Sequence, residues 1–259
     1  MYQIKVDTHV HSIFTNHAYS TIEENARHAK DCGLEGIAIT DHVGPLFTDD
    51  LKATTLNIMN RNVLPEKMHG VRILKGIEID IVDFEGNLAF FNTPHIFRAD
   101  LSAGKVLLEK CELVIASVHQ TGDFHGGTIE EHTKMYTNVI RNPYVDIIGH
   151  SGRSGMAYDI EEVIRVAKEE GKIIEINNHS MHVRNCSDTC REIAKECAKQ
   201  GVYITVSSDA HCAYSLGNYD KAFALLESID FPQELIANAT EERLYSILKA
   251  NREKRKALK

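Results

Sequence analysis

Short apolar runs alternate with amphipathic segments along the chain. Seven runs are rich in β-branched and other apolar residues, and they predict strands at 4–9, 36–40, 71–79, 113–118, 145–149, 173–176 and 202–207. Segments of helical periodicity predict helices at 21–32, 51–60, 128–141, 159–170, 187–200 and 217–229. A last helix is expected from Thr240, and its basic end should be solvated. The chain therefore repeats a strand–helix unit.

The predicted strands are apolar along their length and do not alternate with polar residues. This pattern is typical of a parallel sheet that is buried on both faces, and it places the protein in the α/β class. No linker and no shift in composition interrupts residues 1–259, so we expect one domain. Its architecture is either a βα barrel or a doubly wound sheet.

Charge and composition narrow the classes of protein. The net charge of −8 argues against a protein that coats nucleic acid, although bound metals could reverse the charge locally in a nuclease. No apolar run reaches the roughly 18 residues of a membrane helix, and the first residues read as a strand, not as a targeting segment. Six cysteines without paired spacing favour reduced thiols and a cytoplasmic location.

Histidine is unusually frequent, with 14 residues, and metal ligation is a common reason for such an excess. Potential ligands occur at or just after most of the predicted strands: His9, His11, His17, His42, Glu78, His119, His150, Asp209 and His211. The carboxyl ends of parallel strands form the active-site face of α/β folds, so these side chains should converge on one mouth. Each alone is weak evidence, but together they exceed the needs of a single metal and predict a metal cluster.

These residues also lie in short motifs that resemble a known family. The ordered set DTHVHS (7–12), ITDH (39–42), GIE (76–78) and SDAH (208–211), with His119 and His150 between, is similar to the pattern of the PHP (polymerase and histidinol phosphatase) family. HAYST (17–21), INN (176–178) and FP (231–232) resemble its single-domain YcdX-like bacterial phosphatases most. Ser151 departs from that branch, in which proline tends to follow the histidine, so substrate contacts there are open.

The resemblance implies a distorted (βα)7 TIM-like barrel with three divalent metals at the carboxyl ends of its strands. Carried over by motif, His9, His11, Glu78 and Asp209 hold one metal, and Glu78 bridges to a second that His119 and His150 also hold. The third is held by His17, His42 and His211. Zinc suits an imidazole-rich site best, whereas manganese or iron would also be accepted.

We expect a hydrolase that acts on small phosphate monoesters, with a metal-bridged hydroxide as the nucleophile. The residues assigned to catalysis through that hydroxide are His9, His11, Glu78, His119 and Asp209. Arg153 and Arg184 are candidate phosphate ligands, because a guanidinium matches phosphate oxygens. Asp7 and Asp41 either orient neighbouring imidazoles or satisfy the backbone at the strand ends.

Other functions remain open from the sequence. A histidinol-phosphate phosphatase and a nuclease acting on phosphodiesters would use the same ligands. A non-catalytic metal-binding or partner-binding module is a reading of a different class, since a fold does not imply activity. The expected partner is a small phosphorylated substrate, without nucleic acid or membrane, and a homo-oligomer is possible.

Overall fold

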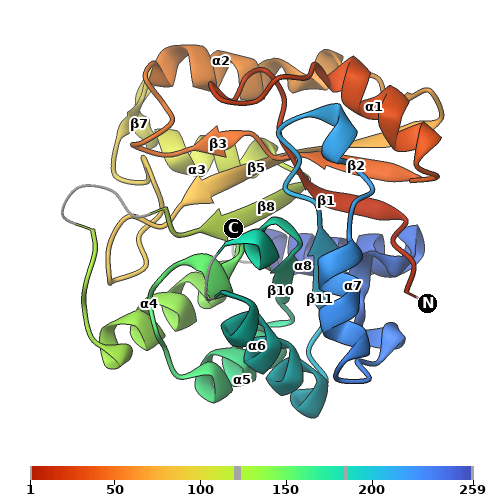
Figure 1. The fold of residues 1–259 in the computed structure, drawn as a ribbon. Coiled ribbons are helices and arrows are strands. Elements are labelled where there is room, and N and C mark those ends of the chain that lie inside the picture. The colour runs from red at the N-terminus through yellow and green to blue at the C-terminus, as the bar shows by residue number, and fades with distance from the viewer. Residues whose placement is uncertain (1, 120–123, 184–185, 258–259) are drawn as a thin grey trace.

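The computed structural model describes residues 2–119, 124–183 and 186–257. Its main sheet runs in the order β1 (Val6–Val10), β2 (Gly36–Ile39), β5 (Val71–Asp80), β8 (Leu113–Ser117), β9 (Ile147–Ile148), β10 (Ile173–Asn177) and β11 (Ile204–Ser207) (Figure 1). Every neighbouring pair in this order is parallel. The predicted α/β class and all seven predicted strands are confirmed. The short strands β3 (His42–Val43) and β4 (Lys67–Met68) also pair with β5.

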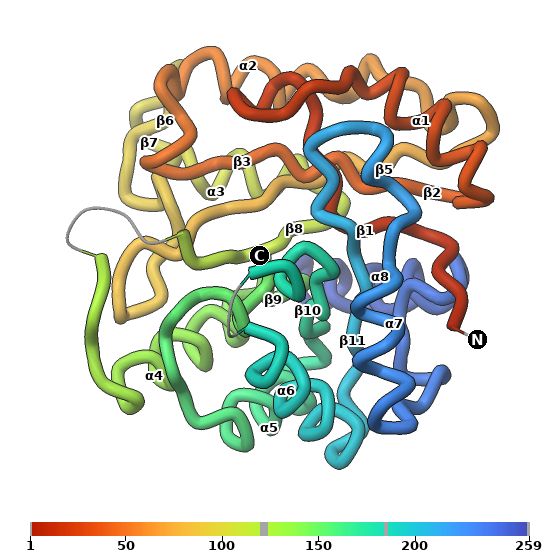
Figure 2. Tube along the Cα trace, in the orientation of Figure 1, coloured from red at the N-terminus to blue at the C-terminus, as the bar shows by residue number. Residues whose placement is uncertain are grey.

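The first and last strands of this order return to one another, which makes the sheet a nearly closed barrel. Val10 and Ala210 form a parallel bridge, and the N–H of His11 donates to the carbonyl of Ala210 at 2.9 Å. Figure 2 shows the red trace of β1 beside the blue trace of β11. Strands that follow each other around the sheet in chain order and close on the first exclude the doubly wound alternative.

The side chain of Asn238 supports this closure from outside the strands. It is fully buried, and its Nδ2 donates to the carbonyls of Val6 (2.8 Å) and Val206 (2.6 Å). Its Oδ1 accepts from the N–H of Val206 at 3.1 Å. One amide group thus joins β1 to β11 where the two strands have few direct ladder bonds.

The helices lie outside the barrel or across its end (Figure 1). Their bounds are α1 Ile22–Asp31, α2 Leu51–Asn60, α3 Ala103–Lys110, α4 Ile129–Arg141, α5 Ile160–Glu170, α6 Cys186–Gln200, α7 Asp220–Glu227 and α8 Glu241–Ala257. Short 3-10 turns cover Arg61–Val63, Ser151–Arg153, His179–His182, Ala213–Ser215, Gln233–Leu235 and Ala237–Ala239. All predicted helices are present. Helix α3 and the hairpin of β6 (Pro94–His95) and β7 (Arg98–Ser102) were not predicted.

Helix α8 packs across the end of the barrel that lies opposite the strand carboxyl ends. Leu244 and Leu248 share a buried cluster with one or two apolar side chains from each of six main strands, β1, β2, β5, β8, β9 and β10. The basic end of this helix is not entirely solvated. Arg255 is 8% exposed and donates to the carbonyls of Pro143 (3.1 Å) and Tyr144 (2.9 Å). Within the described residues, no helix combines the length and apolar character that crossing a bilayer requires.

Candidate metal centre

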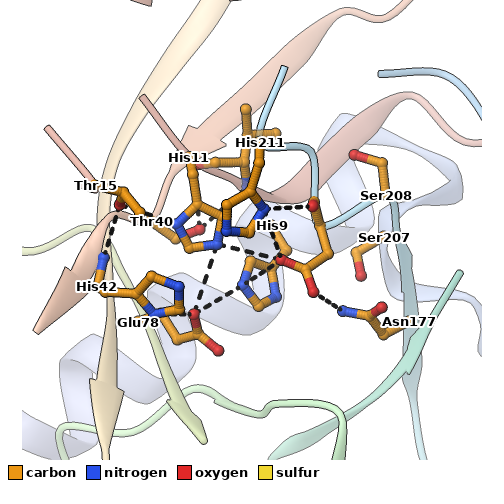
Figure 3. A network of polar contacts seen from close by, with 12 residues as sticks. His9, His11, Thr15, Thr40, His42, Glu78, Asn177, Ser207, Ser208 and His211 are labelled. Carbon is orange, nitrogen blue, oxygen red and sulfur yellow. Dashed lines mark hydrogen bonds and ion pairs between the residues drawn. The ribbon is translucent and has the colours of Figure 1, made fainter. Parts of the chain in front are cut away.

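All nine predicted ligands lie at the carboxyl-terminal end of the barrel. His9 lies in β1, His42 in β3 and Glu78 in β5, and the others follow strands or stand in the loop after β1. Their imidazole rings form a continuous set of contacts, such as His11–His211 at 4.1 Å and His42–His119 at 4.9 Å between ring centroids. Figure 3 shows the rings of His9, His11, His42 and His211 gathered around Glu78.

The first group is the most regular. His9 Nε2 lies 3.2 Å from Glu78 Oε2 and 3.5 Å from Asp209 Oδ1. His11 Nε2 lies 3.6 Å and 3.2 Å from the same two oxygens. A tetrahedral ion with bonds of 2.0–2.1 Å needs ligand atoms about 3.4 Å apart. Four donors from three strands therefore stand at the spacing that one such ion requires.

Several of these candidate ligand atoms form no hydrogen bond within the described part of the protein. Among the described residues, His9 Nε2, His11 Nε2, His42 Nδ1 and Glu78 Oε2 are buried and have no hydrogen-bond partner. Buried polar atoms without partners are rare because they lose their hydration without compensation. A cation coordinated between them removes that cost, so the residues present fit a metal.

Glu78 faces a second group with its other oxygen. Its Oε1 lies 2.8 Å from His150 Nε2 and 3.7 Å from His119 Nε2, while its Oε2 faces the first group. One carboxylate therefore points its two oxygens at two sets of imidazoles, which is the arrangement that a bridging ligand needs.

The third group lies nearest to solvent. His17 Nε2 and His211 Nε2 are 3.0 Å apart, and His17 is exposed. His42 stands between two groups, since its Nδ1 lies 2.9 Å from Glu78 Oε2. Ligand atoms lie within 4.8 Å of one another in three sets: His11, His42 and His211; His9, His11 and Asp209; and His42, Glu78 and His119. The division of the nine side chains among three metals stays a prediction.

The protonation of three imidazoles suits cation binding, whereas for the buried His9 the carboxylates Glu175 and Glu78 outweigh the effect of burial and raise the pKa. Burial alone would raise the pKa of Glu78, but the imidazoles of His9, His42 and His119 hold it well below its usual range. Burial lowers the pKa of His11 to about 4, of His42 to about 3 and of His150 to about 4. These imidazoles are neutral near pH 7 and keep a lone pair for a metal.

Two buried carboxylates that sequence reasoning missed stand behind the ligands. Glu175 Oε1 accepts from His9 Nδ1 at 2.7 Å, and Asp80 Oδ1 accepts from His119 Nδ1 at 2.8 Å. Both carboxylates leave the Nε2 of their imidazole free for coordination. Asp80 follows Glu78 by two positions, so the even spacing along the strand was an available signal. For Glu175, the only signal in the sequence was the presence of a charged residue between isoleucines in an apolar strand.

Asp7 and Asp41 do not orient imidazoles directly. Asp7 accepts from the N–H of His9 and Ser208 and from the Tyr219 hydroxyl. Asp41 accepts from groups of the loop after β1 and from a guanidinium, namely Ser12, Thr15 and Arg61. The alternative of ordinary strand-end hydrogen bonds is therefore correct for both.

A cavity of about 560 Å³ opens over the metal centre. It is lined by His17, Tyr19, His42, Phe47, His119, Arg153, His179, Ser208, Asp209, His211, Cys212 and Ser215. The turn Ser151–Arg153 brings Arg153 to this wall, where its Nη2 donates to Asp209 Oδ2 at 2.8 Å. Its Nη1 is buried and has no hydrogen-bond partner among the described residues. Arg184 lies outside the described residues.

Comparison with known proteins agrees with this geometry. The sequence profile of the PHP domain matches residues 7–209. The chain belongs to the PHP family. Two PHP relatives, each named "Probable phosphatase", come from Acetivibrio thermocellus and Clostridium novyi and are 42% and 40% identical to this chain. The alignments cover 96% and 95% of this chain and 97% and 94% of the relatives. The predicted family and branch are confirmed.

A solved structure supports the fold. The histidinol phosphate phosphatase of Lactococcus lactis, crystallised with zinc, L-histidinol and phosphate, superposes with a TM-score of 0.58 at 20% identity. The match covers 88% of this PHP chain and 94% of that one. The barrel predicted from the resemblance is thus confirmed as an architecture that a zinc-containing phosphatase also uses.

Proposed function

We propose that this protein is a metal-dependent phosphatase that hydrolyses small phosphate monoesters at a cluster of three divalent metals, with zinc the best-suited ion. The observation that carries the proposal is the set of unpartnered buried atoms around Glu78, at ligand spacing. The names of the relatives at about 40% identity support the same reaction class.

The metals, when bound, supply two things: neutralisation of the phosphate charge and activation of water. The chain supplies the rest. Glu78 holds two ligand groups at a fixed separation, and Arg153 together with Asn177 (3.2 Å from Asp209 Oδ2) fixes the orientation of Asp209. Arg153 also lines the cavity, where its guanidinium would bind a phosphate oxygen.

The size of the cavity favours small substrates over polymers. About 560 Å³ is within the range of small-molecule sites. A nuclease would prefer an open basic groove, whereas this chain has a net charge of −8. Tyr19 and Phe47 on the wall would contact the alcohol part of the ester. We therefore place phosphodiesters second.

We also propose that residues 1–259 form one domain, since helix α8 packs against the interior of the barrel that β1 to β11 enclose. No disulfide joins cysteines within the described residues, which supports a reducing, cytoplasmic compartment.

The test is elemental analysis of the purified protein together with hydrolysis of a chromogenic phosphate monoester, the matching diester and histidinol phosphate. We expect up to three zinc, manganese or iron ions per chain and faster hydrolysis of monoesters. His119→Ala and Asp209→Ala should abolish activity, and His69→Ala, at an exposed histidine, should not. No activity after zinc or manganese is restored would exclude the phosphatase and favour a metal-binding module.

A further inference from the structure

The supporting hydrogen bonds differ among the three ligand groups. In the first group, His9 Nδ1 donates to Glu175, which is 2% exposed. In the second, His119 Nδ1 donates to Asp80, which is also 2% exposed. A carboxylate behind an imidazole fixes the orientation of the ring and raises its basicity toward a metal. Each of these groups therefore contains one histidine that is both fixed and strengthened.

In the third group, His42 Nδ1 faces only the shared carboxylate of Glu78 at 2.9 Å, and neither His17 nor His211 is hydrogen-bonded to a carboxylate in the described structure. His17 Nδ1 lies 2.8 Å from the side-chain oxygen of Asn16, and both residues are exposed. His211 Nδ1 lies 3.0 Å from the backbone carbonyl of Asp209, and its side chain is 28% exposed. Neutral oxygens strengthen an imidazole less than a carboxylate does, and open access to water speeds release of an ion.

Glu175 does more than support one ring. Its Oε2 accepts from the backbone N–H of His150 at 2.6 Å, and its Oε1 also accepts from Ser207 Oγ at 2.6 Å. His150 has a positive φ of 22°, a conformation that costs energy for a residue with a side chain. The hydrogen bond from its N–H to Glu175 stabilises that conformation, so Glu175 positions a ligand of the second group as well.

We propose that Glu175 and Asp80 are positioning residues that make the first two metal positions tight, and that the third position, at His17, His42 and His211, is the weak and exchangeable one. The inference rests on the metal cluster of the proposed function and adds an order of affinity to it. Loss of a supporting carboxylate typically lowers metal affinity by about 10–100-fold, so a gap of that size is expected between the third position and the other two.

The experiment is stepwise removal of zinc from the full-length protein by dialysis against chelator buffers of graded free zinc, with elemental analysis at each step. The parent should release one equivalent at about 10–100-fold higher free zinc than the other two. His17→Ala, a change at an exposed residue, should lack this weak equivalent and keep both tight ones. Cobalt in place of zinc gives an independent optical reading of the same steps.

The positioning roles are tested by Glu175→Gln and Asp80→Asn. Asp80→Asn should weaken one tight equivalent, and Glu175→Gln should weaken both, since Glu175 contacts groups of both sets. Asp146→Asn is the matched control, because Asp146 is equally buried but accepts from Val114 and Asn251 at the opposite end of the barrel. Circular dichroism verifies that each variant is folded.

Release of all equivalents in one step by the parent would overturn the order of affinity. Parental zinc affinities in folded Glu175→Gln and Asp80→Asn would overturn the positioning roles. These results are separable from the proposed function. Graded zinc release without phosphoester hydrolysis would support this inference and contradict the proposed phosphatase activity. Phosphoester hydrolysis with release of all zinc in one step would support the phosphatase activity and contradict the order of affinity.

Discussion

Arg153 Nη2 lies 2.8 Å from Asp209 Oδ2, while the other oxygen of that carboxylate faces His11 Nε2 at 3.2 Å. Asp209 therefore joins a guanidinium on one side to a group of candidate metal ligands on the other. Asp209 has a positive φ of 56°, so its backbone conformation is costly and must be stabilised by these contacts. The pairing fixes Arg153 in the wall of the cavity.

Arg153→Ala should lower kcat/KM for phosphate monoesters by roughly tenfold to a hundredfold, since a charged hydrogen bond contributes about 1.5–3 kcal/mol. The kcat/KM of Arg153→Lys should lie between those of the parent and of Arg153→Ala, because an ammonium cannot hold Asp209 and a phosphate in the same fork geometry. Steady-state kinetics measure both. Arg165→Ala, at an exposed residue of helix α5, is the control. Unchanged kinetics in Arg153→Ala would exclude a role for Arg153 in binding phosphate.

The convergence of the nine candidate ligands could be predicted because each stands at or near the end of a strand. Parallel strands bring their carboxyl ends together, so positions from His9 to His211 converge without any knowledge of the strand order. Of the two supporting carboxylates, Asp80 also stands at the end of a strand, but Glu175 could not be predicted in this way. Glu175 and His9 are 166 residues apart, and their contact depends on which strands are neighbours across the closed barrel.

The strand and helix pattern alone did not predict closure of the barrel, which only the family resemblance implied, and the elements between β5 and β8 were not predicted. A doubly wound sheet has the same strand and helix pattern, whereas closure here involves the Val10–Ala210 bridge and Asn238, a buried side chain in a 3-10 turn that has no periodic signal. Helix α3 and the β6–β7 hairpin lie in a stretch where polar residues interrupt the apolar pattern, and five residues of β7 are mostly exposed. Tertiary contacts, not periodicity, define these elements.

Asn238→Leu should destabilise the fold by at least about 3 kcal/mol, because it leaves the carbonyl of Val6 and both backbone groups of Val206 buried without their partner. Leucine keeps the volume, so the loss reports the hydrogen bonds and not a cavity. Urea denaturation measures it, with Asn92→Leu at an exposed site as the control. Equal midpoints for Asn238→Leu and the parent would show that closure does not depend on this side chain.

Lys172 should make stability depend on pH above neutrality. Burial lowers its pKa from 10.5 to about 8, with Asp146 opposing the shift and Arg255 adding to it, while Nζ donates to the carbonyl of Val145 at 2.6 Å. Between about pH 8 and pH 10.5 the folded state therefore binds fewer protons than the unfolded state, and stability from this group rises with pH. Below pH 8, Lys172 is charged in the folded state, and burial of that charge lowers the stability of the fold.

The free energy of unfolding of the parent minus that of Lys172→Met should therefore increase by about 3 kcal/mol between pH 8 and pH 10.5. The subtraction removes the titration of tyrosines and cysteines common to both proteins. Lys254→Met, at an exposed residue of α8, should show no such change relative to the parent. A difference that stays constant with pH would mean that Lys172 is charged throughout this range.

Glu78→Gln should have the largest effect on metal content of any single change in the centre. The two oxygens of Glu78 face different ligand groups. In glutamine an amide nitrogen replaces one of these oxygens, and this NH2 group carries no charge and cannot coordinate a metal. Zinc affinity should fall by more than the roughly 10–100-fold expected for loss of a supporting carboxylate, and at two positions at once.

Glu78→Asp keeps the charge but is shorter, so it should retain one position and lose the bridge. Elemental analysis after dialysis, with exposed Glu85→Gln as the control, distinguishes these outcomes. Loss of a single equivalent in Glu78→Gln would show that Glu78 serves one metal and that the two groups do not share it.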